Sequence, residues 1–380
     1  MKIGIPVLDE LIGEIPLGKV ITYYIDPEVE GDVFSMQTLY SNLEKYKCVF
    51  ITSSMSPSSI RARFREFGWN VDESENFSIL DAYSGYIGDI SDERYIVRDP
   101  SNLDEMDKVV SKAIEENDLI VFGSLSTLID MIGEEILDYV ERWNKYARIN
   151  DSVILYNFVA WPYDSRIVDT IKDLSNAVIE VGGIYHRVIL GQYYGILKVD
   201  WKEVKGKAVL FKLVKPGGIK AYIPKILVTG PYNAGKSTFV HAISCRAVSV
   251  DRLGTTVALD HGHVEYKRFS IDVFGTPGQE RFDPILRILG GEALGVILII
   301  DSTKPEDFPR AKQMLEATTK FGLPYVVAAN KRDLPNALGV DEIRKRLTVP
   351  KEVPIVPCSA VKKEGVFDVL DALLNLLIGG

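Results

Sequence analysis

The sequence predicts an α/β protein with two domains, each a mainly parallel sheet flanked by helices. A phosphate-binding motif begins past the middle of the 380-residue chain, at residues 230–238. Apolar, strand-like runs alternate with amphipathic segments through the preceding part, which is typical of a parallel sheet with helices on both faces. The chain is also long enough for two hydrophobic cores. We therefore expect domains at residues 1–222 and 223–380.

The alternation defines the elements of the first domain. Strand-like runs lie at 19–25, 47–52, 77–80, 118–122 and 152–156, and helical segments at 31–45, 58–67, 102–116 and 134–148. From 177 to 214, β-rich segments containing Gly182, Gly183, Gly191 and Gly206 predict hairpins added to this sheet. The segment 215–221 predicts either a short interdomain linker or the last turn of the first domain.

The second domain begins with the apolar run 226–229, which leads into Gly-Pro-Tyr-Asn-Ala-Gly-Lys-Ser-Thr and a predicted helix. In such a loop, backbone N–H groups close around phosphate oxygens and a lysine contacts the β- and γ-phosphates. The expected phosphate-binding residues are Gly230, Asn233, Ala234, Gly235, Lys236, Ser237 and Thr238. The Ser237 hydroxyl is also an expected ligand of Mg²⁺.

The base is predicted by Asn330-Lys-Arg-Asp333, which follows another apolar run at 325–329. The Asp333 carboxylate can accept hydrogen bonds from both N1–H and the exocyclic amine of guanine, a donor pair that adenine lacks. Asn330 is expected to tie this loop to the phosphate loop, and the Lys331 stem to cover the base. Ser359 and Ala360, after the run 353–357, are expected to meet the guanine oxygen through a backbone N–H.

These motifs resemble those of the small Ras-like GTPases. Residues 264–267 and 330–337 resemble the Arf branch, and 255–260 and 275–280 resemble its prokaryotic relatives, including the MglA polarity GTPases. The resemblance covers about residues 223–380. It implies that Thr256 closes on the γ-phosphate and gives its hydroxyl to Mg²⁺, that Gly278 donates a backbone N–H, and that Gln279 orients the attacking water.

One position departs from the family pattern. Gly275 stands where the second switch of this family has an aspartate that holds a Mg²⁺-bound water. Asp272 does not replace it, because a strand at 269–274 places that side chain on the opposite face. Asp260 is a possible replacement, or else an ordinary turn or strand residue before Val264. Without this aspartate we expect slow intrinsic hydrolysis of GTP, and an activating partner that supplies the missing stabilisation.

The first domain resembles the RecA superfamily, specifically KaiC- and RadA-like proteins, through residues 4–11 and 15–20. In this resemblance Asp26, Asp32 and Val33 replace a glycine, the lysine and the Ser/Thr of a phosphate loop. Carboxylates there would repel a triphosphate. Ser54-Met55 replaces the catalytic glutamates and Gly123 replaces the metal-binding aspartate. The resemblance therefore implies a pseudo-ATPase that acts as a scaffold or regulator.

Composition restricts the surroundings and partners. The net charge of −9 and pI of about 5.2 argue against binding nucleic acid. Three scattered cysteines fit neither a disulfide framework nor a metal site, so we expect a cytoplasmic protein. His261 and His263 are interpreted as part of a polar connection. The start Met-Lys-Ile lacks a myristoylation glycine and no apolar run spans a bilayer, so no intrinsic membrane anchor is expected.

The favoured function is a regulatory GTPase that binds GTP or GDP with Mg²⁺ and, when GTP orders its switches, recruits a protein effector. Activating or exchange proteins are possible further partners. The alternative is a GTP-dependent scaffold with negligible hydrolysis, which Gly275 favours and Gln279 opposes. A third possibility, an oligomeric RecA-like motor, is weakened by the altered loop at residues 26–33.

Overall fold

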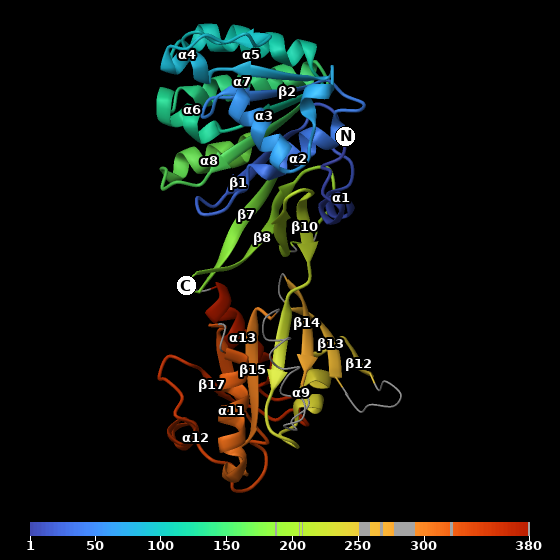
Figure 1. Ribbon diagram of the computed structural model, residues 1–380, viewed down its shortest axis with the longest axis vertical. Helices are drawn as coiled ribbons and strands as arrows, with labels where there is room; N and C mark the ends of the chain where they lie inside the picture. The colour runs from blue at the N-terminus through green and yellow to red at the C-terminus, as the bar shows by residue number, and fades with distance from the viewer. Residues whose placement is uncertain are drawn as a thin grey trace. The chain divides into compact units, whose positions relative to one another are not determined.

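The computed structural model describes residues 1–186, 188–204, 206, 208–250, 259–266, 269–276, 293–319 and 322–378. The chain divides into two compact units (Figure 1). The first unit contains residues 1–183 and 192–222, and the second contains residues 184–191 and 223–380. Each unit is built on one sheet, so the predicted α/β class with mainly parallel, helix-flanked sheets is confirmed.

The sheet of the first unit has the strand order β10-β9-β8-β7-β1-β6-β5-β2-β3-β4. From β7 through β4 the printed pairings are parallel, whereas β8–β9 and β9–β10 are antiparallel. Its strands are β1 Val20–Ile25, β2 Cys48–Thr52, β3 Phe77–Asp81, β4 Tyr95–Ile96, β5 Leu119–Phe122, β6 Val153–Val159, β7 Ala177–His186, β8 Val188–Val199, β9 Ala208–Val214 and β10 Gly218–Tyr222.

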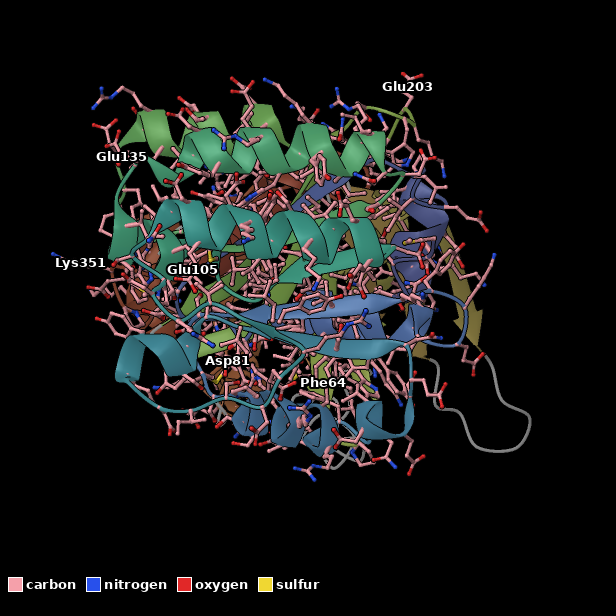
Figure 2. The ribbon with its side chains drawn as sticks, turned by 90° about the horizontal axis from the view of Figure 1, so that it is seen from above. Phe64, Asp81, Glu105, Glu135, Glu203 and Lys351 are labelled. Atoms are coloured by element: carbon pink, nitrogen blue, oxygen red, sulfur yellow. The ribbon has the colours of Figure 1, made fainter. Side chains whose placement is uncertain are left out.

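Helices cover both faces of this sheet, as Figure 2 shows around the labelled Phe64 and Asp81. Side chains of α2 and α3 enter one core cluster, and those of α5 to α8 enter the other. Sequence signals begin several of these helices: Pro57 follows the N-cap Ser56, and the Asn102 side chain accepts from the first turn of α5. The helices are α1 Pro6–Ile12, α2 Val33–Asn42, α3 Pro57–Glu66, α4 Tyr83–Ile87, α5 Leu103–Glu116, α6 Leu125–Ile132, α7 Ile136–Ile149 and α8 Ser165–Leu174.

Of the expectations for the end of the first unit, one is corrected and one agrees with the structure. Residues 215–221 are not a linker, because they form the turn and most of β10, which pairs with β9 in a hairpin. The predicted alternative, a last turn of the first domain, is closer. The predicted addition of hairpins to this sheet agrees with the structure, because β8 pairs antiparallel with β9, and β9 with β10. Gly206 lies in the connection between β8 and β9, whereas Gly182, Gly183 and Gly191 lie within β7 and β8. A glycine inside a strand leaves room for a close neighbour instead of making a turn.

The second unit has the strand order β12-β13-β14-β11-β15-β16-β17, and β11, β14, β15, β16 and β17 are parallel. Its strands are β11 Lys225–Thr229, β12 Arg246–Val250, β13 Leu259–Tyr266, β14 Phe269–Gly275, β15 Gly295–Asp301, β16 Tyr325–Asn330 and β17 Ile355–Pro357. The described helices are α9 Lys236–Ile243, α11 Phe308–Thr319, α12 Val340–Leu347 and α13 Val366–Ile378. His261 and His263, expected in a connection, lie in β13.

Candidate functional site

The phosphate-loop residues connect β11 to α9 at the carboxyl edge of the second sheet. Gly230 has φ 147°, and a Cβ there would collide with the carbonyl oxygen of Ile299 in β15. Gly235 has φ 96° and is the N-cap of α9, and a Cβ there would collide with the Asn330 amide. Both positions therefore require glycine for conformation and for space. The loop lies against neighbouring strands and leads directly into a helix N-terminus, where N–H groups attract anions.

Lys236 is folded back over this loop. Its side chain is buried and its Nζ donates to the Pro231 carbonyl oxygen at 2.7 Å. Burial lowers the pKa of Lys236 to about 8, although the nearby charge of Asp260 opposes the shift. Ser237 and Thr238, the next two residues, are exposed. A desolvated cation beside an exposed hydroxyl is suited to a phosphate and its metal ion.

Asn330 joins the two loops that were predicted to contact phosphate and base. Its Nδ2 donates to the Ala234 carbonyl oxygen at 2.9 Å, and its Oδ1 accepts from the Ala360 N–H at 3.0 Å. The side chain is buried, with 2% exposure. Asn330 is the last residue of β16, so its side-chain amide lies at the edge of the sheet. There it connects the phosphate loop, through Ala234, with the loop at Ala360.

The base-side loop presents one exposed carboxylate. Asp333 is exposed, and a hydrogen bond from Ser359 is the main cause of the lowered pKa of Asp333. Ser359 is itself buried and exchanges backbone hydrogen bonds with Glu364 at 2.9 and 3.1 Å. Asp333 is therefore held ionised at the surface, where it can accept hydrogen bonds from a ligand.

Sequence reasoning missed Asp301, at the end of β15. Its Oδ2 accepts from Lys331 Nζ at 2.7 Å, and its Oδ1 accepts from the Thr303 hydroxyl at 2.6 Å. Burial alone would raise the pKa of Asp301, but these hydrogen bonds lower it. The ion pair fixes Lys331, which has φ 62°, so that its stem is held in place. The sequence feature that could have indicated Asp301 is an acidic residue at the carboxyl end of a buried strand.

Asp260 lies directly opposite Gly275 in the antiparallel pair β13–β14. A Cβ at Gly275 would lie 3.1 Å from Asp260 Cβ and 3.3 Å from its Oδ2. The Asp260 carboxylate thus covers the position where a side chain at 275 would be, and its charge acts on Lys236. Asp260 is a strand residue, as one interpretation predicted. Its location opposite Gly275 is also compatible with the other interpretation, in which it replaces the missing switch aspartate.

Asp272 lies on the opposite face of β14. Its Oδ1 is 2.9 Å from His263 Nδ1 and 3.4 Å from His261 Nε2. These contacts agree with the expectation that Asp272 does not replace the missing switch aspartate. Of the other predicted residues, Thr256, Gly278 and Gln279 lie outside the described part of the chain. No group of three potential metal ligands is found among the residues that the structure describes.

In the corresponding loop of the first unit, residues 26–32, acidic side chains are paired with an arginine of the same unit. Arg63 of α3 pairs with Asp32, with Nε–Oδ2 at 2.7 Å and Nη2–Oδ1 at 2.9 Å, and reaches Glu30 at 3.4 Å. At the end of β5, a Cβ on Gly123 would lie 2.7 Å from the Phe50 ring. An aspartate does not fit there without moving that ring.

These two sheets and their loops define the class of the molecule: two α/β domains of P-loop type in one chain. Residues 214–377 match the model of the ADP-ribosylation factor (Arf) family, and residues 1–141 match a KaiC ATPase model. The chain therefore carries an Arf-family domain after a KaiC-like domain, as the resemblances predicted. Among described residues, no helix is long and apolar enough to cross a membrane.

Each of the following relatives matches only part of the chain. ADP-ribosylation factor-like protein 1 of Saccharomyces cerevisiae is 28% identical over 161 residues, covering 40% of this chain and 87% of that protein. A UPF0273 protein of Thermotoga maritima is 31% identical over 136 residues, covering 34% of this chain and 56% of that protein. Among solved structures, a KaiC-like protein of Pyrococcus horikoshii is 19% identical with a TM-score of 0.49, covering 58% of this chain and 98% of that one.

Proposed function

We propose that the second unit binds GTP and GDP with Mg²⁺ and acts as a regulatory switch that hydrolyses GTP slowly. The Arf-family domain supports a GTP-binding regulatory protein. The observation that carries the finer proposal is the Asn330 side chain, which joins the phosphate loop to the base-side loop. A ligand that spans both loops, with phosphates at one end and a base at the other, suits this arrangement.

Guanine is the proposed base because Asp333 is an ionised, exposed acceptor at the end of the base-side loop. Its two oxygens match the adjacent N1–H and exocyclic amine of guanine. Lys331, fixed by Asp301, would cover the ring with its aliphatic stem. Ser359 and Ala360 would meet the guanine oxygen through a backbone N–H. In the structure the Ser359 N–H donates to the Glu364 carbonyl oxygen and the Ala360 N–H to Asn330 Oδ1, so the guanine oxygen would share or replace one of these acceptors.

Mg²⁺ fits the residues that surround the phosphate loop. Ser237 offers an exposed hydroxyl, and Asp260 places a carboxylate over Gly275. Ser237 and Thr256 would hold the ion, with Asp260 in place of the missing switch aspartate. When bound, Mg²⁺ would offset the negative charge of the β- and γ-phosphates. Gln279 would orient the attacking water.

The first unit is proposed to be a domain, ending at residue 222, that has lost ATP chemistry and acts as a scaffold or regulator. The Arg63–Asp32 pair and the lack of space at Gly123 support this. A cytoplasmic location and a protein effector, with activating or exchange proteins as further partners, complete the proposal. The effector would bind the switches when GTP orders them.

The test is equilibrium titration of the full chain with GTP, ATP and xanthosine triphosphate, for wild type and Asp333→Asn. Wild type should bind GTP and ignore ATP. The asparagine amide can donate to the xanthine oxygen that replaces the guanine amine, so the variant should prefer xanthosine triphosphate. We expect about a 100-fold loss of GTP affinity, because the asparagine cannot accept hydrogen bonds from both N1–H and the exocyclic amine of guanine. Unchanged GTP binding by the variant would contradict guanine recognition by Asp333.

The second candidate is a GTP-dependent scaffold with negligible hydrolysis, favoured by the absence of a side chain at Gly275. Single-turnover hydrolysis of bound GTP separates the two functions. A measurable rate that falls in Gln279→Leu supports the switch. A complex that keeps its GTP intact, with or without that substitution, supports the scaffold.

A further inference from the structure

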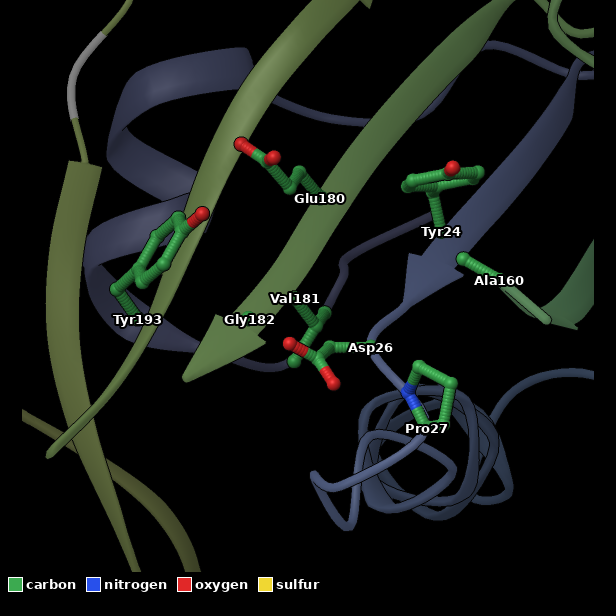
Figure 3. A pocket seen from close by; sticks show the side chains of 8 residues that line it. All are labelled: Tyr24, Asp26, Pro27, Ala160, Glu180, Val181, Gly182 and Tyr193. Atoms are coloured by element: carbon green, nitrogen blue, oxygen red, sulfur yellow. The ribbon is translucent and has the colours of Figure 1, made fainter. Parts of the chain in front are cut away.

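Acidic and aromatic side chains lie together in a cavity of the first unit, but they are engaged within the protein. The cavity has a volume of about 240 Å³, and Figure 3 shows the Glu180 carboxylate between the rings of Tyr24 and Tyr193. Lys172 Nζ lies 4.6 Å from the centroid of the Tyr24 ring, and Glu180 and Tyr193 each interact with another group of the protein. A different region of this unit, at α4, presents acidic and apolar side chains to solvent.

Helix α4 lies between β3 and β4, near one edge of the first sheet, and both of its ends are fixed (Figure 1). At its start, the buried Asp81 carboxylate accepts from the N–H groups of Tyr83 and Ser84 at 2.9 Å and from the Ser84 hydroxyl at 2.6 Å. At its end, Gly88 has φ 74° and the Asp89 N–H donates to the Ser84 carbonyl oxygen at 2.9 Å. This is the bond of a Schellman cap, so the backbone is held in place.

One side of α4 is packed and the other is open. A Cβ on Gly85 would lie 2.4 Å from the carbonyl oxygen of Arg98, so the helix rests directly on the backbone there. Tyr86 and Ile87, the next two residues, are 64% and 53% exposed, and Ile90 after the cap is 89% exposed. These three side chains are here called the α4 surface. Large apolar groups that gather on an exposed, fixed backbone are typical of a docking site.

The border of the α4 surface is acidic. No lysine, arginine or histidine occurs in residues 67–93, whereas Asp89 and Asp92 flank Ile90 and are exposed. The Asp89 carboxylate accepts from the Ile90 N–H at 2.9 Å, a local contact at the surface. No hydrogen bond or ion pair joins the Asp92 carboxylate to another residue that the structure describes. Both carboxylates can therefore attract a cationic group from a partner.

The nearby arginines compensate only part of this charge. Arg61 of α3 and Arg94 are already paired with glutamates, and Arg98 is exposed beside the two exposed aspartates. An apolar and negative surface repels anionic lipid headgroups and nucleic acid. Two copies of this chain that met through the same surface would bring like charges together. The α4 surface therefore fits a partner that is apolar and positive.

We propose that the α4 surface binds a basic amphipathic helix of a partner protein. The apolar face of such a helix would cover the three exposed side chains, and its lysine or arginine residues would pair with the two aspartates. Because the backbone of α4 is already fixed, binding would require little ordering of this surface. The first unit, proposed to be a scaffold, would thereby have a defined site for a partner.

The test is titration of the full chain with fluorescently labelled amphipathic peptides of about 18 residues. The first peptide has leucines on one helical face and lysines on the other, the second has glutamates in place of the lysines, and the third has serines in place of the leucines. Only the first should bind. Ile90→Ser should weaken its binding about tenfold, because a buried apolar contact is lost. The double variant Asp89→Asn, Asp92→Asn should weaken binding mainly at low salt, because it removes the charge attraction.

Two variants on other helices are the matched controls. Ile149→Ser removes an apolar side chain that is 77% exposed at the end of α7, and Asp169→Asn removes an exposed carboxylate from α8. Neither should change peptide binding. Urea unfolding of each variant should match the wild type, because all of the replaced side chains are exposed.

Several results would overturn the proposal. These are no binding of the leucine–lysine peptide, equally tight binding of the glutamate peptide, and binding that is the same in Ile90→Ser and the wild type. Binding to phosphatidylserine vesicles that is lost in Ile90→Ser would indicate a membrane instead, and self-association lost in that variant would indicate a second copy. Asp333→Asn should keep peptide binding while it loses GTP affinity, so failure of this proposal is distinguishable from failure of the proposed nucleotide site.

Discussion

The loops after β1 and β11 occupy the same place in two sheets and have opposite chemistry. After β11, two glycines approach neighbouring atoms closely, and Lys236 brings a positive charge over the loop. After β1, Asp32 stands at the start of α2 and is paired with Arg63. The loop after β11 therefore has a positive charge that a bound anion could neutralise. The loop after β1 has a carboxylate that is already paired with an arginine. The shared fold supplies the position of both loops, while a few side chains set the charge that each loop presents.

The largest expected effect on nucleotide binding comes from replacing the charged residue in each of the two loops. Lys236→Ala should weaken GTP binding by about 100-fold, since hydrogen bonds to charged groups contribute about 1.5–3 kcal/mol each. In the same titrations, Asp32→Lys should not create ATP binding, because Val33 gives no hydroxyl and Gly123 has no space for an aspartate. Micromolar ATP binding by Asp32→Lys would show that this one residue alone accounts for the difference in nucleotide binding between the two domains.

A smaller effect is expected at the carboxylate over Gly275. Asp260→Asn should raise the Mg²⁺ concentration needed for half-maximal GTP retention by about tenfold, the lower end for residues that orient a metal's ligands. Asp272→Asn is the control, because it makes the same change on the opposite face of the neighbouring strand. Equal shifts in the two variants would contradict a specific role for Asp260.

The smallest effect concerns pH. The Lys236 pKa of about 8 is below the value of about 10.5 in the unfolded chain. Between these values the unfolded chain binds more protons, so the nucleotide-free protein should become more stable as pH rises from about 8 to 10.5. GTP affinity should change in the opposite direction, because binding needs the charged amine.

Urea unfolding between about pH 7 and 10.5 and GTP titration between about pH 7 and 9 measure these two trends. Lys236→Arg is the control, since arginine stays charged throughout this range. A GTP affinity that is equally independent of pH in the wild type and in Lys236→Arg would argue against titration of this lysine.

Much of the fold follows from local patterns. The runs 47–52, 118–122 and 325–329 correspond to β2, β5 and β16, because buried parallel strands are continuous apolar segments. Helix ends were predicted less well: α2 covers Val33–Asn42 within the predicted 31–45. The residues before it remain a loop, in which Asp26 accepts from the Glu28 N–H.

The features that could not be predicted depend on contacts between distant residues. Whether Asp260 meets Gly275 depends on the register of two strands. The pairing of Asp301 with Lys331 depends on adjacent strands ending at one edge. The Tyr193 ring occupies the space beside Gly182, and this contact joins two different strands. No local window of sequence contains these partners.

The Asn330 amide has a consequence for ligand length. One short side chain holds Ala234 and Ala360, so the spacing between the two loops is nearly constant. A guanine nucleoside without phosphates, or pyrophosphate without a base, would reach only one of them. The domain should therefore discriminate ligands by their span as well as by their chemical groups, and each fragment alone should bind far more weakly than GDP.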